Sequence, residues 1–338
     1  MSHPPQFAPL PVQNLSVFPA EAFRVTHGVN LGDPIADASD LILEDVYGLD
    51  ERAKMQRLAI CAGQEDGRFF IAQGSAAGHP GAPLFLDCLT VFMSTHGATE
   101  EALVLVEVSP EDGSIVQTYL YPLTPLKAKT GYSLVTIDRD GAHARLAESA
   151  CISFTRGTHI TLAGGRQCLI EDLKVGDQVL TRDSGAQQVR WIGEQTVRAS
   201  GAFAPIVIAP GTLNNTGALT VSPNHRLFVY QRVDAMGAGQ KELLIKARLL
   251  VNDTTVTRAE GGFVDYFQIL FDKHEIIYAE GIASESLMVD ITTRPAIPSS
   301  VQGQLPEDTP GDHGARELDE ADLVKQNAVD LLRRASTL

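Results

Sequence analysis

The segment CISFTRGTHITLAGGRQCLIEDLKVGDQVL, residues 151–180, decides the fold of the second half of the chain. Its short apolar runs are separated by small and polar residues, and the pair Gly176-Asp177 is typical of a turn between two strands. Runs of the same kind recur as far as about residue 290. This pattern predicts a β domain over residues 151–290, in which Cys151 opens the first strand.

A similar series of short runs lies before residue 150. LFLDCLTVFMS, ALVLVEV, SIVQTYLY and YSLVTI are rich in β-branched and aromatic residues, and Gly, Pro, Asp and Ser separate them. They predict a second, smaller, β-rich domain over residues 36–150, with no chemistry of its own that we can name. Residues 1–35 are Pro-rich and weakly patterned, which predicts an N-terminal arm. The stretch 40–57 has room for a short helix.

The C-terminal segment changes character twice. Residues 291–316 are poor in apolar residues and hold four prolines, which predicts a flexible linker. Residues 317–338 regain apolar residues at helical spacing. Asp319 is placed to cap this helix, acidic residues fill its first turn, and Arg333 and Arg334 fill its last. We expect a short C-terminal helix that either docks on the domain or binds a partner.

Composition limits the classes of partner. The chain has 338 residues and 44% hydrophobic content, which suits two domains, and 29 Gly and 18 Pro favour short strands over a helical bundle. A net charge of -15 repels phosphate backbones and anionic lipid, so we expect neither a nucleic acid nor a membrane partner. The N-terminus lacks the features of a cleaved signal peptide. We therefore expect a cytoplasmic protein, or one exported by a route without such a signal.

The four cysteines give no metal or redox motif. Cys61, Cys88, Cys151 and Cys168 lie too far apart in sequence for a zinc knuckle or a CxxC pair. In a chain of this length, reduced thiols are the expected state. We predict no metal and no other cofactor.

Four blocks follow one another in the second half. Cys151 comes first, Gly176 to Leu180 follows, then Ser222-Pro-Asn-His225, and finally the block from His274 to Gly281. Their order and spacing resemble the Hint family of hedgehog C-terminal domains, inteins and bacterial intein-like domains. The chain is most similar to bacterial Hint proteins with an extra N-terminal region. The resemblance covers about 140 of the 338 residues and implies an all-β horseshoe that brings Cys151 beside the His block.

The chemistry that the resemblance implies is an acyl shift from nitrogen to sulfur. Cys151 would attack the carbonyl of Ala150 and form a thioester there. His225 matches the general acid that protonates the leaving nitrogen, a task for a group that titrates near neutral pH. Ser222 matches the hydroxyl of the same block, and donors must stabilise the developing oxyanion or strain the amide.

Other residues have weaker assignments. His274 and Asp177 are candidates for shaping the site. Cys168 is expected to be a core or loop thiol, and the single histidines His79 and His96 receive no role.

The last block lacks one feature of the family. Splicing inteins end on a His-Asn pair whose Asn cyclises, whereas residues 282–288 read IASESLM. We therefore expect cleavage or transfer without splicing. The chain's own N-terminal region would be the substrate, and water or a small nucleophile the acceptor. The hedgehog sterol-binding extension has no counterpart in the Pro-rich segment, so a sterol acceptor is not expected.

Two hypotheses therefore remain. In the first, the chain is a self-acting cysteine autoprotease or acyl-transfer protein that turns over once. In the second, it is an inactive Hint scaffold that serves as a structural or interaction domain. The sequence leaves the oligomeric state open.

Overall fold

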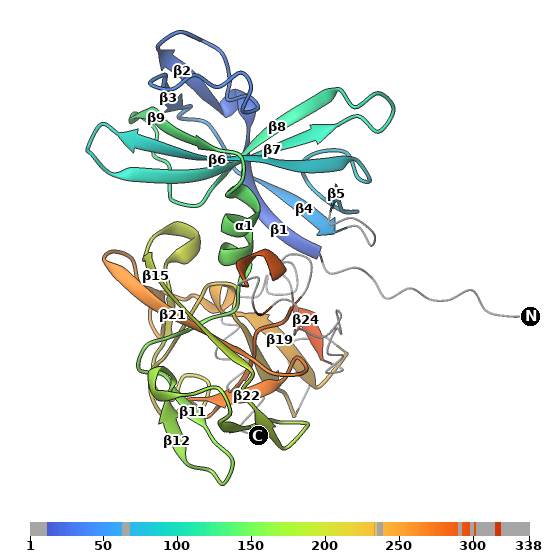
Figure 1. The fold of residues 1–338 in the computed structure, drawn as a ribbon, viewed down its shortest axis with the longest axis vertical. Helices are drawn as coiled ribbons and strands as arrows, with labels where there is room; N and C mark the ends of the chain where they lie inside the picture. The colour runs from blue at the N-terminus through green and yellow to red at the C-terminus, as the bar shows by residue number, and fades with distance from the viewer. Residues whose placement is uncertain are drawn as a thin grey trace, which may run out of the picture. The chain divides into compact units, whose positions relative to one another are not determined.

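A computed structural model describes residues 12–62, 68–232, 234, 239–289, 293–297, 301 and 315–318. The chain divides into two compact units, Met1–Leu146 and Ala147–Leu338. Both consist mainly of β-strands (Figure 1), which confirms the predicted fold class. Within the described residues, no helix combines the length and the apolar composition that a membrane span requires.

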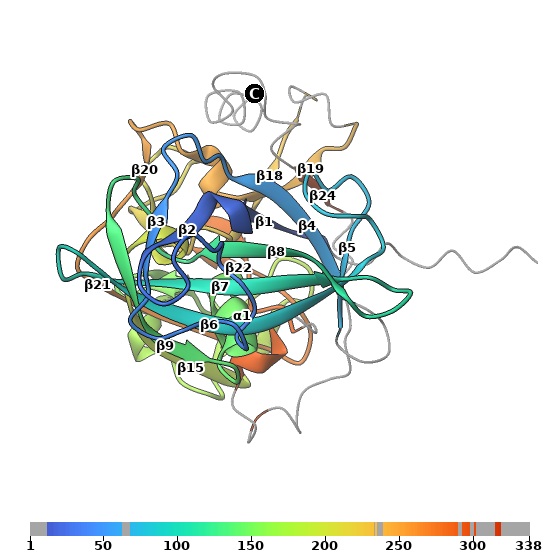
Figure 2. The same cartoon turned by 90° about the horizontal axis from the view of Figure 1, so that it is seen from above.

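The first unit is built on one nine-stranded sheet. Its strands are β1 (Val12–Pro19), β2 (Phe23–His27), β3 (Val46–Leu49), β4 (Gln56–Ala62), β5 (Phe69–Ile71), β6 (Pro83–Ser94), β7 (Thr99–Val108), β8 (Ile115–Pro122) and β9 (Gly131–Asp138). Their order is β2-β3-β9-β6-β5-β4-β1-β8-β7. Strand β7 also pairs with β6. The strands β6, β5, β4, β1, β8 and β7 therefore form a closed ring. Figure 2 shows β6, β7 and β8 running side by side.

The predicted N-terminal arm is wrong for residues 12–35. Strands β1 and β2 belong to the sheet, and alternate side chains such as Leu15 and Val17 are buried. Phe23 stacks on Tyr47 with ring centroids 5.2 Å apart. This period-two burial is the signature of a half-buried strand, which the surrounding prolines obscured. Residues 1–11 lie outside the described part of the chain.

The helix suggested within residues 40–57 is also absent. The structure forms β3 there and starts β4 at Gln56. Tyr47 is fully buried among aromatic rings, and β3 pairs with both β2 and β9. Sheet pairing with distant strands therefore overrides the local preference.

A helix that the sequence analysis missed precedes Cys151. Helix α1 spans Ala142–Ala150 and begins after a turn in which Asp138 accepts hydrogen bonds from the backbone N–H groups of Asp140 and Gly141, each at 3.0 Å. Its sequence, AHARLAESA, is dominated by strong helix formers. Cys151 consequently follows a helix, and the first strand of the second unit starts three residues later, at Phe154.

The second unit contains three sheets. Its strands are β10 (Phe154–Thr155), β11 (His159–Thr161), β12 (Gln167–Leu169), β13 (Gln178–Leu180), β14 (Ala186–Gln188), β15 (Trp191–Arg198), β16 (Ile206–Ile208), β17 (Leu219–Val221), β18 (Arg226–Tyr230), β19 (Glu242–Lys246), β20 (Val256–Arg258), β21 (Phe263–Leu270), β22 (Ile276–Ala279), β23 (Ile282–Glu285) and β24 (Arg316–Leu318). One sheet has the order β15-β21-β10-β17-β16-β20, another β12-β11-β22-β23-β18-β19-β24, and β13 pairs with β14.

Among the residues that the structure describes, five short 3₁₀ helices lie between strands of the two units. They are η1 (Ala20–Ala22), η2 (Ile170–Asp172), η3 (Gly201–Phe203), η4 (Ala247–Leu250) and η5 (Arg294–Ala296).

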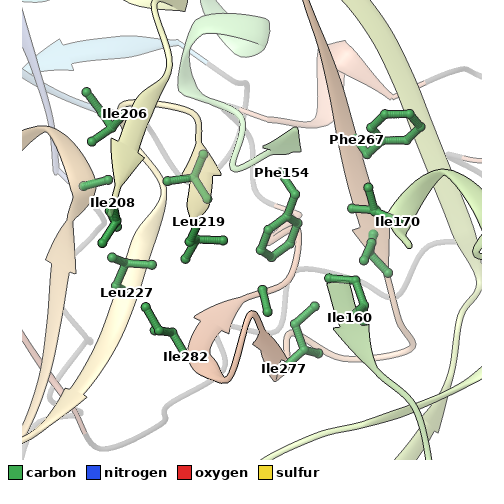
Figure 3. Packing of buried hydrophobic residues seen from close by; sticks show 14 of the residues in the cluster. Phe154, Ile160, Ile170, Ile206, Ile208, Leu219, Leu227, Phe267, Ile277 and Ile282 are labelled. Carbon is green, nitrogen blue, oxygen red and sulfur yellow. The ribbon is translucent and has the colours of Figure 1, made fainter. Parts of the chain in front are cut away.

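One apolar core joins the two large sheets of the second unit. Figure 3 shows Phe154, Ile160 and Ile277 gathered in this core, together with Leu219 and Leu227. Phe154 comes from β10 in the first sheet, whereas Ile160 and Ile277 come from β11 and β22 in the second. The residues just after Cys151 are therefore fixed by packing from both sheets.

The predicted C-terminal helix is wrong at its first residues. Glu317 and Leu318 end strand β24, which pairs in parallel with β19. The Leu318 side chain is 1% exposed and packs in the core of the second unit, so burial and sheet pairing outweigh helical spacing here. Residues 319–338, including Asp319, Arg333 and Arg334, lie outside the described residues.

The segment predicted as a linker is described in part. Its residues 293–297 include η5, and Ile297 is 2% exposed. The hydroxyl of Thr293 donates to the carbonyl oxygen of Met288 at 2.7 Å. These residues pack on the domain, while the linker prediction for residues 298–300 and 302–314 falls outside the described part of the chain.

Truncating Leu318 tests whether β24 belongs to the domain. We expect Leu318→Ala to lower the free energy of unfolding by about 2–5 kcal/mol, because it removes a buried side chain and leaves a cavity. Urea denaturation of the full chain measures this. Val175→Ala is the control, since that side chain is exposed and its loss should change stability little. Equal stability of the two variants would show that β24 is not part of the core in solution.

Candidate active site

The Ser222–His225 block forms a tight turn between β17 and β18. The backbone N–H of His225 donates to the carbonyl oxygen of Ser222 at 3.0 Å. Ser in the first position and Pro in the second, here Pro223, are the residues that a type I turn favours. The backbone N–H groups of Ala247 and Arg248 donate to the carbonyls of His225 and Pro223, at 2.8 and 3.0 Å. The block is thereby fixed on both sides.

The structure brings Ser222 and Cys151 together. The Ser222 hydroxyl donates to the carbonyl oxygen of Cys151 at 3.1 Å and accepts from the backbone N–H of Ser153 at 3.1 Å. The backbone N–H of Ser222 also donates to the Ser153 carbonyl at 2.9 Å. The hydroxyl thus holds the backbone after Cys151, and the carbonyl that it contacts is not the one of Ala150.

His225 is fully buried and neutral at ordinary pH. Its Nδ1 lies 3.1 Å from the carbonyl oxygen of Ser153, which only accepts, so Nδ1 carries the hydrogen and Nε2 has a lone pair. Nε2 is buried with no hydrogen-bond partner among the described residues. Burial lowers the pKa of His225 to about 3, partly opposed by the bond to Ser153, and the charge of Arg226 lowers it further. This imidazole must therefore first take up a proton before it can act as the general acid that the sequence analysis expects, and that role stays a prediction.

The Cys151 side chain lies in a small apolar cluster. It is 1% exposed and packs with Leu270, Leu287 and Ile297. We call these four residues the Cys151 cluster. Leu287 follows strand β23, and Ile297 comes from the segment predicted as a linker. Leu287 and Ile297 therefore both help to cover the thiol.

The amide between Ala150 and Cys151 lies at the end of a regular helix. The N–H of Cys151 donates to the carbonyl oxygen of Ala147 at 2.9 Å, as the last helical hydrogen bond, and also faces Glu148 at 3.3 Å. Neither Ala150 nor Cys151 has a positive φ. Before this nitrogen leaves, the last helical turn must open, which costs about the net worth of one hydrogen bond, ~1 kcal/mol.

Asn224 is a site residue that the sequence analysis missed. Its side-chain amide donates to the carbonyl oxygen of Ser149 at 2.9 Å, and Arg248 Nε donates to the Asn224 side-chain oxygen at 3.3 Å. The last carbonyls of a helix lack partners within it, and Asn224 supplies one. The signal was its place inside the SPNH block, where only the Ser and the His were assigned.

The two candidates for shaping the site make contacts of their own. His274 is buried, with Nε2 3.5 Å from Oε1 of Glu285. Asp177 accepts a hydrogen bond from the backbone N–H of Lys174 at 2.9 Å, inside the turn at Gly176. Their influence on the chemistry stays a prediction.

The other cysteines stand apart from this chemistry. Cys168 lies in β12 opposite Ile160, and burial raises the pKa of its thiol. Cys88 is buried in the first unit, where burial also raises the thiol pKa. All four cysteines are reduced in the structure. Among the described residues, no three His, Cys, Asp or Glu side chains are grouped to hold a metal ion.

The family model of the Hint domain matches residues 152–290. The chain therefore contains a Hint domain at residues 152–290. The match begins at the residue after Cys151 and takes in the Ser222–His225 turn, and it includes none of the first unit. A Hint domain supports an autoprocessing-type capability in general.

Solved structures similar to this Hint domain include three of intein type. They are a DnaB intein from Synechocystis sp. PCC 6803 (13% identity, TM-score 0.27, covering 40% of this chain and 98% of that one), the TvoVMA intein (16%, 0.28, 40% and 96%) and a bacterial intein-like domain from Clostridium thermocellum (14%, 0.26, 40% and 96%). No curated protein matches the chain in sequence.

Proposed function

We propose that the Hint domain cleaves its own chain between Ala150 and Cys151 through a thioester on Cys151. One observation carries the proposal. A single turn holds the backbone after the nucleophile through Ser222, and the same turn presents a buried imidazole whose Nε2 is unprotonated. A nucleophile and a proton carrier fixed on adjoining segments are what an acyl shift requires.

In the proposed shift, one proton is transferred, and a carbon–sulfur bond replaces a carbon–nitrogen bond. His225 Nε2 accepts the thiol proton of Cys151, and the sulfur attacks the carbonyl carbon of Ala150. The bond from this carbon to the Cys151 nitrogen then breaks, and His225 returns the proton to that nitrogen. Because the proton is taken up and given back, the step needs no charge on the imidazole beforehand, but the lowered pKa of His225 makes it a weak base for the thiol proton. Water or another small nucleophile then attacks the thioester and releases the N-terminal region.

The proposed reaction ends without splicing. Leu287 packs in the Cys151 cluster, and an apolar side chain cannot cyclise to release a second flank. Residues 282–288 hold no Asn. Mass spectrometry of the products should therefore show no peptide that joins Ala150 to a residue beyond Gly281.

The inactive-scaffold alternative keeps its own support. The amide before Cys151 makes a regular helical hydrogen bond, and the thiol is buried under apolar side chains. Both features are those of a resting state. For cleavage, the last helical turn would have to open, and the apolar side chains that cover the thiol would have to move.

One incubation separates the two functions. The purified full chain is kept with and without dithiothreitol, and the fragments are resolved on a gel and sequenced from their N-termini. The proposal expects thiol to raise the yield of a fragment that starts at Cys151. A chain that stays intact for days in thiol, while folded by circular dichroism, would favour the scaffold.

Replacing Ser222 should have an intermediate effect. We expect Ser222→Ala to slow cleavage about 5- to 30-fold, because the two hydrogen bonds of this hydroxyl hold the backbone of Cys151 and Ser153, and each is worth ~1 kcal/mol. Gel time courses measure the rate. Ser222→Thr keeps the hydroxyl and is the control. If Ser222→Ala were as slow as a variant without His225, the hydroxyl would have a larger part in the chemistry than we assign.

A further inference from the structure

Arg226, the residue after His225, makes its contacts on the opposite face of the chain from His225. Successive side chains of a strand point to opposite faces. His225 faces the Ser153 carbonyl and Phe154, whereas the guanidinium of Arg226 meets two carboxylates. Its Nε donates to Oε2 of Glu285, and its Nη1 lies 3.2 Å from Oε2 of Glu317. Fixing Arg226 therefore fixes the start of β18, which directly follows His225 in the chain.

Three strands meet at this guanidinium. Glu285 ends β23 and is 1% exposed, and burial raises its pKa to about 7 although Arg226 opposes the rise. Glu317 lies in β24, and its other oxygen is 2.8 Å from Nζ of Lys246 in β19. Glu317 thus bridges two cations, and Arg226 bridges two anions. A forked guanidinium in such an arrangement has a defined orientation.

The positive charge of Arg226 also affects the pKa of His225. It is one of the causes that lower the pKa of this imidazole. Glu317 offsets part of that charge, and Lys246 and Arg226 in turn lower the pKa of Glu317, so it stays ionised. Removing its charge would loosen Arg226 and strengthen the positive field at the imidazole.

We propose that Glu317, acting through Arg226, is a positioning residue for His225. The inference rests on the proposed function, because it assigns His225 a part in the reaction. It also assigns a role to β24, which lies beyond the residues matched by the family model.

The test compares Glu317→Gln with Glu242→Gln. Glu242 lies in β19, pairs with Arg182 at 2.7 Å and has a side-chain exposure of 34%, against 39% for Glu317. Arg182 is not a neighbour of His225 in sequence, so the control loses an ion pair of the same kind at a different place.

Cleavage rates are measured in the full chain. The ¹⁵N spectrum of the histidines is recorded in a Cys151→Ala background, where the chain stays intact, and His225→Gln assigns the signal.

We expect Glu317→Gln to slow cleavage about two- to fivefold, the range for a partly exposed ion pair. The His225 signal, which in the parent should show one neutral tautomer with the proton on Nδ1, should shift toward a tautomer average. Glu242→Gln should change neither. An unchanged His225 spectrum in Glu317→Gln overturns the inference, whether or not the rate falls. If the parent does not cleave at all, the proposed function fails, and the His225 spectrum alone decides the positioning role.

Discussion

Cys151→Ala should leave the full-length chain intact under every condition in which the parent is cleaved. No other group can form the thioester at Ala150, because the nucleophile must belong to the residue just after the bond. The substitution should preserve the fold, since alanine is tolerated in the apolar surroundings of the Cys151 cluster. A gel time course in dithiothreitol, with circular dichroism of the same sample, gives the result.

Two other cysteines serve as controls for this experiment. Cys168→Ala and Cys88→Ala should cleave at nearly the parental rate, because Cys168 lies in β12 and Cys88 in the first unit. Cleavage that survives Cys151→Ala, or a fragment with a different N-terminus, would contradict the mechanism.

His225→Ala should slow cleavage by roughly 10²–10⁴-fold, the usual contribution of a positioned proton carrier. Since the pKa of His225 is lowered to about 3, its titration should add no inflection to the rate between pH 5 and 8. His159→Ala is a suitable control. That histidine pairs with Glu280 at 2.8 Å and is half-exposed. A rate within threefold of the parent in His225→Ala would remove the imidazole from the mechanism.

The same variant should change how acid affects stability. The folded pKa of His225 lies below the value of about 6.5 that an unfolded chain shows, so the unfolded state binds more protons between these values. The stability that comes from keeping this His neutral is present above pH 6.5 and is lost as the pH falls toward 3. Urea midpoints of His225→Ala should therefore fall less steeply over this range than those of the parent.

The order of the motifs was enough to predict the Hint-type fold and the meeting of two site residues. Ser222 and Cys151 are 71 positions apart, and the structure places them in hydrogen-bond contact. The turn at Ser222-Pro223, which the sequence analysis did not assign, has residues that local turn preferences favour. These features depend on short-range signals or on the spacing of whole blocks, both of which a sequence displays.

Other features depend on distant contacts that the sequence does not display. The pKa of His225 is set by complete burial, and strand β24 is three residues long and exists through its pairing with β19. Ile297 lies between prolines and is nevertheless buried beside Cys151. Helix α1 is a different kind of error, because its helix-forming residues are visible in the sequence but the sequence analysis placed them in a β-rich domain.

Helix α1 has a consequence for the direction of the proposed reaction. Its last residues belong to the part of the chain that would be released, while Asn224, which holds the Ser149 carbonyl, stays behind. Before cleavage the helix end and the turn are joined by the chain, so their local concentration is high. Afterwards the same contact joins two molecules and weakens on dilution. Separation of the fragments, more than the chemistry of the bond, would then make the cut irreversible.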